Sequence, residues 1–137
     1  MHRIGRTAAA VATAAAMAVG GVILTTGTAH ADASTATWDY LTNTGHGVGV
    51  YSKPWTGNGS TQTPKPLFWR AGNPDAVQID CWTAGGDVGS YGDVWYRTWA
   101  VYYATTNSEP TYNVAWTFAP FVDSAGLFHN GVLPQCP

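Results

Sequence analysis

Residues 94–104, VWYRTWAVYYA, form the strongest β-strand signal in this chain of 137 residues. Aromatic and β-branched residues dominate the segment, and these types fit the pleated, half-buried surface of a strand. Alternate residues of a strand point to opposite faces, so Tyr96 belongs to one face and Trp95, Arg97 and Trp99 belong to the other. We expect the Tyr96 face to be the core and the Arg97 face to be more exposed, with the guanidinium group stacked on a tryptophan ring.

Shorter segments with the same character lie on both sides of this strand, separated by stretches rich in glycine and proline. They are residues 47–52 (GVGVYS), 67–69 (LFW), 76–83 (AVQIDCWT) and 113–118 (NVAWTF). No window beyond the N-terminal region has a helical period of 3.6 residues, and no internal repeat is present. The pattern therefore predicts a single small all-β domain, either a barrel or a sandwich.

The N-terminus has the pattern of a cleaved signal peptide, with two arginines followed by a run rich in alanine, valine and threonine. Ala29 and Ala31 supply the small residues that signal peptidase requires. We therefore expect cleavage after Ala31, which leaves Asp32 as the first residue, with a cut after Ala33 as the alternative. A membrane anchor is the competing interpretation, since the run is almost long enough to span a bilayer. Its alanine, threonine and glycine content and the lack of a basic stop favour cleavage.

Export gives the two cysteines of the chain, Cys81 and Cys136, a specific meaning. Two thiols that leave the reducing cytoplasm are expected to form one disulfide. This bond closes a loop of about 55 residues and joins the C-terminal end to a strand in the middle of the chain, which stabilises the fold by about 4 kcal/mol in the chain-entropy model. Roughly 106 residues remain after cleavage, enough for one domain, and a domain of this size benefits from such a crosslink.

The charge balance excludes two classes of partner. After loss of the signal peptide the positive residues are Lys53, Lys65, Arg70 and Arg97, against eight acidic residues, for a net charge of about −4. A basic patch that could bind nucleic acid or an anionic lipid surface is therefore not expected. We expect a secreted monomer, extracellular or associated with the cell wall, with no nucleic-acid partner and no membrane partner after cleavage.

Residues suited to catalysis are few. His46 and His129 are the histidines outside the signal peptide, and neither lies in a hydrolase or metalloprotease motif. A serine–histidine–carboxylate site assembled by the fold is an open alternative, as is a pair of carboxylates at Asp80 and Asp93 across a hairpin. We expect these acids to be solvated surface residues, and we expect no enzyme activity, metal site or cofactor.

The aromatic residues are the main indication of function. Seven Trp, seven Tyr and four Phe all follow the signal peptide. This number exceeds what one small core needs to bury, so some rings are expected on the surface. Exposed aromatic faces bind sugar rings and extended peptides at a low cost in conformational entropy.

The order of these landmarks resembles the bacterial SH3-like family, in particular its secreted single-domain form. The matching segments are residues 49–54 (GVYSKP), Leu67 with Gly72, 81–86 (CWTAGG), 93–97 (DVWYR), 115–122 (AWTFAPFV) and 133–136 (LPQC). Two departures are a longer loop at residues 105–112 and the lack of an Arg-Ser-Gly-Pro run in the first loop, residues 55–66. The resemblance implies an SH3-like barrel of five to six strands over residues 46–137, after a tether or edge strand at residues 32–45 and a signal peptide at residues 1–31.

The resemblance also implies a ligand groove between the first loop and the turn that closes the barrel. The ring residues that we assign to this groove or to the neighbouring exposed face are Tyr51, Trp55, Trp95, Trp99, Trp116 and Phe121. We therefore expect a non-catalytic binding module for cell-wall peptide or glycan, such as peptidoglycan. The alternatives are a secreted protein-interaction or inhibitor module and a small secreted hydrolase.

We predict that the secreted protein begins at Asp32 or Ser34, because the residues before these positions suit signal peptidase. N-terminal sequencing or intact-mass measurement of the protein from culture fluid tests this prediction. Recovery of the chain in a membrane fraction with Met1 intact would instead establish the membrane anchor.

Overall fold

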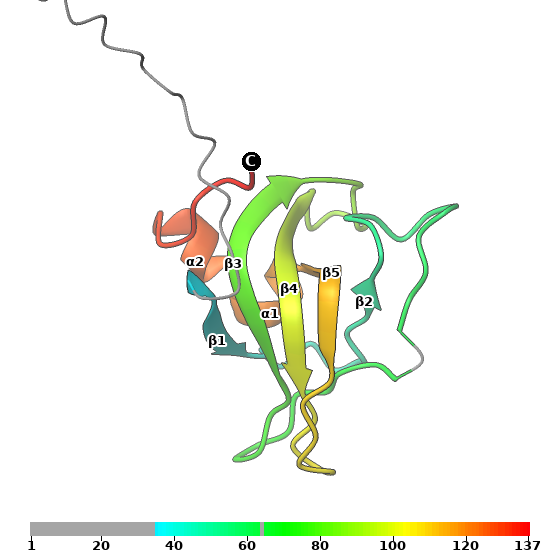
Figure 1. Ribbon diagram of the computed structural model, residues 1–137, viewed down its shortest axis with the longest axis vertical. Coiled ribbons are helices and arrows are strands. Elements are labelled where there is room, and N and C mark those ends of the chain that lie inside the picture. The colour runs from blue at the N-terminus through cyan, green and yellow to red at the C-terminus, as the bar shows by residue number, and fades with distance from the viewer. Residues whose placement is uncertain (1–34, 64) are drawn as a thin grey trace, which may run out of the picture.

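The computed structural model describes residues 35–63 and 65–137 of the chain. The predicted signal peptide and its cleavage at Ala31 and Asp32 lie outside these residues. Within them, the chain folds into one five-stranded antiparallel sheet with the strand order β1-β3-β4-β5-β2 (Figure 1). The elements are β1 (Thr37–Tyr40), β2 (Val50–Tyr51), β3 (Ala76–Ala84), β4 (Val94–Tyr102), β5 (Thr111–Phe118), α1 (Ala119–Asp123) and α2 (Gly126–His129).

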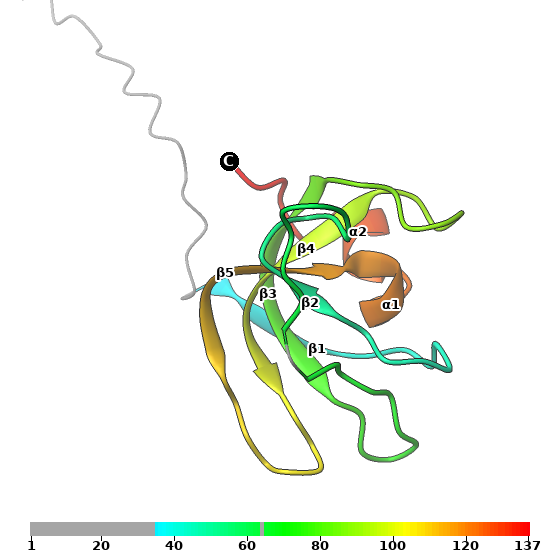
Figure 2. The same ribbon diagram turned by 90° about the vertical axis from the view of Figure 1, so that its right-hand side faces the viewer.

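The predicted all-β fold is confirmed, but the sheet is open, so the predicted closed barrel is not what the structure has. The terminal strands of the order, β1 and β2, do not pair with each other. The outer side of β2 is taken by the chain that follows it, through bridges from Val48 to Leu67 and from Tyr51 to Gln62. The helix α1 follows the C-terminal end of β5 and packs against β1, β4 and β5 (Figure 2). The strand expected at residues 47–52 is reduced to the two residues of β2. The strand expected at residues 67–69 is reduced to the single bridge between Leu67 and Val48.

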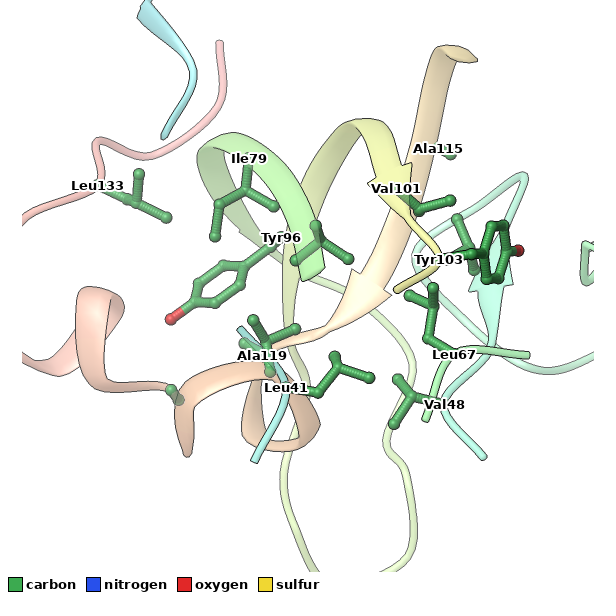
Figure 3. Close-up of a cluster of buried hydrophobic side chains, with 14 residues drawn as sticks. Leu41, Val48, Leu67, Ile79, Tyr96, Val101, Tyr103, Ala115, Ala119 and Leu133 are labelled. Carbon is green, nitrogen blue, oxygen red and sulfur yellow. The ribbon is translucent and has the colours of Figure 1, made fainter. Parts of the chain in front are cut away.

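The hydrophobic core lies between one face of the sheet and the helices. Val77, Ile79 and Tyr96 contribute from β3 and β4, while Ala119 and Val122 contribute from α1. Figure 3 shows this cluster, with Leu133 near one end, Tyr103 near the other and Tyr96 between them. The prediction that Tyr96 faces the core is confirmed.

The buried phenol of Tyr96 connects the sheet to the helices. Its Oη donates a hydrogen bond to Asp123 Oδ1 at 3.0 Å and accepts one from the Phe128 N–H at 3.1 Å. The Leu127 N–H in turn donates to Asp123 Oδ2 at 2.7 Å. A polar group in a core must keep its hydrogen bonds to avoid a desolvation cost, and here the short helices provide them.

Two irregularities in the β3–β4 pairing change the alternation of faces. The register shifts once between Gln78 and Ile79 and again between Ile79 and Trp82. An extra residue in one strand sends the following side chains to the opposite face and increases the local twist. As a result, Val101 joins Tyr96 in the core, although simple alternation would place it on the face of Trp95.

The disulfide predicted from the two cysteines is present between Cys81 and Cys136. The C-terminal tail runs beside the end of β3, where the Trp82 N–H donates to the Pro134 carbonyl at 3.0 Å and the Cys136 N–H donates to the Trp82 carbonyl at 2.8 Å. The tail thereby pairs with the C-terminal part of β3, beyond the residues of β3 that pair with β1. Such a bond is typical of an oxidising compartment. Among the described residues, no helix is long and apolar enough to cross a bilayer.

Replacement of both cysteines, Cys81→Ser with Cys136→Ser, is expected to lower the free energy of unfolding by about 4 kcal/mol, because the unfolded chain gains the freedom of a long loop. Urea unfolding followed by tryptophan fluorescence measures the change. Reduction of the native protein should give the same loss. An unfolding midpoint that neither treatment moves would show that the tail is held without the bond.

Candidate functional site

A hollow of about 200 Å³ lies beside the loop that follows β2, and we call it the ring hollow. Its walls include His46, Tyr51, Trp95, Phe118 and Phe121, and one side is the glycine-containing chain that leads into β2. Three of the predicted groove residues, Tyr51, Trp95 and Phe121, therefore meet in one place. Side chains from β2, β4, β5 and α1 converge there, although they are far apart in the sequence.

The rings of this hollow pack edge to face in a continuous series. The ring centres are 5.7 Å apart for Tyr51 and Trp95, 5.2 Å for Trp95 and Phe118, and 5.0 Å for Phe118 and Phe121. Phe121 also contacts the imidazole of His46 at 4.8 Å. Edge-to-face packing of this kind stabilises aromatic pairs beyond the area they bury. The series holds the walls of the hollow rigid.

Trp95 is fully buried, so it is not the surface ring that the groove prediction requires. Its indole N–H donates a hydrogen bond to the Gly86 carbonyl at 2.9 Å. Phe118 is buried in the same way, whereas Tyr51 and Phe121 are half-buried. Trp95 and Phe118 thus form the base of the hollow, and Tyr51 and Phe121 are the rings that a ligand can reach.

Two adjacent glycines let the first loop lie directly on the end of β3. A Cβ at Gly85 would overlap the Pro54 carbonyl oxygen, and one at Gly86 would lie 2.7 Å from Trp55 Cβ. The Gly86 N–H donates to that same Pro54 carbonyl at 2.8 Å. The backbone of the two glycines thus packs closely against Pro54 and Trp55. The Trp55 side chain is 43% exposed, as expected. It lines a shallow second hollow next to Lys53.

The other two predicted rings, Trp99 and Trp116, lie outside the ring hollow. Trp116 pairs with Tyr51 on one side and with Arg97 on the other, so the three side chains form a row across the outer face of the sheet. The Arg97 guanidinium lies 5.2 Å from the Trp99 ring centre, which confirms the predicted stacking. Among the described residues the buried Nε1 of Trp99 has no hydrogen-bond partner.

Asp80 is a buried ion-pair partner, which corrects the expectation of a solvated surface acid. The Arg97 Nε donates to Asp80 Oδ1 at 3.0 Å and the Arg97 Nη2 donates to Asp80 Oδ2 at 2.7 Å. Asp80 lies in the irregular stretch of β3 between Ile79 and Trp82. Because both carboxylate oxygens bind the guanidinium, Asp80 is committed to a structural pair and does not form a catalytic pair with Asp93.

His46 and His129, the histidines that the structure describes, do not lie next to described carboxylates. Within the described residues, neither His46 nor His129 has a ring nitrogen within 4.0 Å of an acidic oxygen. The Nδ1 of His46 instead lies 3.0 Å from the Gly47 carbonyl oxygen. In the same part of the chain, no group of three or more His, Cys, Asp or Glu residues is arranged to hold a metal ion.

One close pair of carboxyl groups is present, at Asp39 on β1 and Asp123 on α1. Burial raises the pKa of Asp39, and the charge of Asp123 adds to the shift. Burial raises the pKa of the neighbouring Tyr96 as well. This carboxyl pair connects β1 to α1.

Phe118 and Tyr91 are two rings near the hollow that the sequence analysis did not assign to the site. Phe118 forms part of the base, and Tyr91 contacts Phe121 at 5.3 Å. Tyr91 lies in the glycine-rich loop between β3 and β4. A single aromatic residue in a polar loop indicates an exposed ring, and this feature of the sequence could have identified it. Phe118 gave no such signal, because a phenylalanine at the end of a strand is usually a core residue.

No protein-family model matches this chain, and no curated protein or solved structure was found to match it. The resemblance to the bacterial SH3-like family therefore stays a prediction. The role of the ring hollow has to be inferred from its own residues.

We predict that Arg97→Leu costs about 3–5 kcal/mol of unfolding free energy, because it leaves the buried Asp80 carboxylate without its partner. Arg70→Leu is the matched control. Its buried partner, Asp75, also accepts hydrogen bonds from the N–H groups of Phe68 and Ala104, so about 1 kcal/mol or less should be lost. Urea unfolding of both variants tests the difference.

Equal losses in the two arginine variants would contradict the assignment of Asp80 as dependent on Arg97. Asp80→Asn combined with Arg97→Leu provides a further check, since it removes the buried charge. The double variant should be more stable than Arg97→Leu alone.

Proposed function

We propose that this protein is a non-catalytic, extracellular binding module, SH3-like in type, that holds a cell-wall peptide or glycan strand at the first loop. Tyr51 and Phe121 in the ring hollow and Trp55 on the loop are the contact residues. In this assignment Trp95 supports the site from below and does not contact the ligand.

The ring hollow is the observation that supports this role most strongly. It combines accessible faces of Tyr51 and Phe121 with the backbone polar groups of a glycine-containing chain. Lys53 is the one charged side chain that lines the adjoining Trp55 hollow. Apolar faces beside a few polar groups, with little charge, suit a neutral polymer strand better than a charged small molecule.

The two alternatives receive less support. A hydrolase needs a base or nucleophile that is positioned by a second group, and the described histidines have no carboxylate at that distance. A protein-interaction module would use the loop tips, and the tip at residues 57–59 is exposed. None of these tip residues lines the ring hollow, which would have no role in such contacts.

Trp55→Ala is expected to weaken binding to purified peptidoglycan at least fivefold and to leave the melting temperature close to that of the native protein. An exposed ring contributes stacking area to a ligand and little to the core, and a binding ring typically contributes more than 1 kcal/mol. A sedimentation assay on cell-wall sacculi, together with thermal unfolding by circular dichroism, measures both quantities.

Trp69→Ala is the control for this experiment, since Trp69 is 38% exposed and lines neither hollow. Trp95→Ala should instead lower stability by roughly 3–5 kcal/mol, as expected for a buried ring. Equal binding by Trp55→Ala and Trp69→Ala would contradict the site. Retention of a culture-fluid protein in place of peptidoglycan would favour the protein-interaction alternative.

A further inference from the structure

A third hollow, also lined by aromatic rings, lies on the outer face of the sheet, at the end remote from the first loop. It has a volume of about 450 Å³, and we call it the outer trough. Its lining residues are Trp38, Tyr40, Ala76, Tyr102, Asn107 and Glu109. In Figure 1 the C-terminal end of β4 lies at the bottom of the sheet, away from the loop after β2. None of these residues belongs to the ring hollow.

Strand register builds the walls and floor of this trough. Tyr40 on β1 pairs with Ala76 on β3, and Ala76 pairs with Tyr102 on β4. Residues paired directly across strands point to the same face, so a small alanine lies between two tyrosines. Trp38 is two residues before Tyr40 and lies on the same face, about 6.5 Å along the strand. The adjacent Val77 is in the core, which places the trough on the opposite face.

The rings of the trough are not used to build the core. Trp38 is 40% exposed and Tyr40 is 60% exposed. Both lie on the four-residue strand β1. Large exposed rings that gather around a depression are typical of a binding surface.

The turn between β4 and β5 adds polar groups at one end of the trough. The Tyr102 hydroxyl donates a hydrogen bond to Asn107 Oδ1 at 3.1 Å, which orients the Asn107 amide and leaves its NH₂ group to act as a donor. Glu109 is exposed and supplies a carboxylate acceptor beside it. The trough therefore offers flat apolar faces together with a donor and an acceptor.

We propose that the outer trough is a second binding site, distinct from the ring hollow, and that it takes a neutral oligosaccharide. Sugar rings stack their C–H faces on an indole or phenol ring, and their hydroxyl groups can donate to Glu109 and accept from Asn107. Glu109 is the one charged group in the lining, so an anionic ligand is disfavoured. An organic cation would pair with Glu109 but would leave the Asn107 amide without an acceptor.

Saturation-transfer NMR tests this site with three probes: cellotetraose, the tetramer of N-acetylglucosamine, and maltotetraose. We expect at least one of the probes to bind the native protein. Trp38→Ala should weaken that binding at least tenfold, and Ala76→Leu, which fills the floor without removing a ring, should weaken it similarly. Trp69→Ala is the matched control, since its exposure is nearly that of Trp38, and it should bind like the native protein.

Glu109→Gln keeps the shape of an exposed side chain and should weaken binding several-fold even if the larger changes loosen β1.

Failure of all three probes to bind would overturn the proposal, as would equal binding by Trp38→Ala and Trp69→Ala. Binding of tetramethylammonium without any oligosaccharide would replace the saccharide with an organic cation. Trp55→Ala should bind the probes like the native protein, so failure of the outer trough is distinguishable from failure of the ring hollow.

Discussion

The irregular pairing of β3 with β4 determines how the remaining elements are arranged. The shifts in register place Asp80 opposite Arg97 and orient Cys81 toward the C-terminal tail, within one short stretch of β3. They also bring Val101 to the same face as Tyr96, so that a long strand supports the core over most of its length. With strictly alternating faces, Val101 would lie on the face opposite Tyr96 and outside the core. The ion pair and the disulfide both lie in the irregular stretch of β3 between Ile79 and Trp82.

An open sheet of this size needs cover at its ends, and the C-terminal part of the chain provides it. The short helices accept and donate the hydrogen bonds of Tyr96, while the tail pairs with β3 and is crosslinked to it. Edge strands that are left unpaired promote association with other chains. Here β1 and the tail pair with successive parts of β3. At the opposite end of the sheet, the segment after β2 pairs with Tyr51 of β2. Closure into a barrel is not required to protect the sheet.

The aromatic rings gather at the two hollows beside the first loop and at the outer trough, toward different ends of the sheet. The lining of the ring hollow includes Gly47 and Gly49, and that of the outer trough includes Ala76. The turn that supplies Asn107 and Glu109 to the trough is the same segment that departs from the SH3-like pattern. The two proposed sites share one small domain, so simultaneous binding of neighbouring parts of a polymer would be tighter than either contact alone.

The sequence by itself determined the strand-rich fold, the pairing of the two cysteines, the exposure of Trp55 and the stacking of Arg97 on a tryptophan. These depend on local side-chain types, on the number of thiols, and on turn residues next to a ring. Only the tertiary structure decided that Trp95 is buried while Tyr51 is accessible, because the Gly85–Gly86 backbone allows the first loop to cover one ring and not the other. It also decided that Trp38, Tyr40 and Tyr102 share a trough and that the sheet stays open. Strand register and helix packing join residues that are distant in the chain, and no local pattern encodes which partners they will meet.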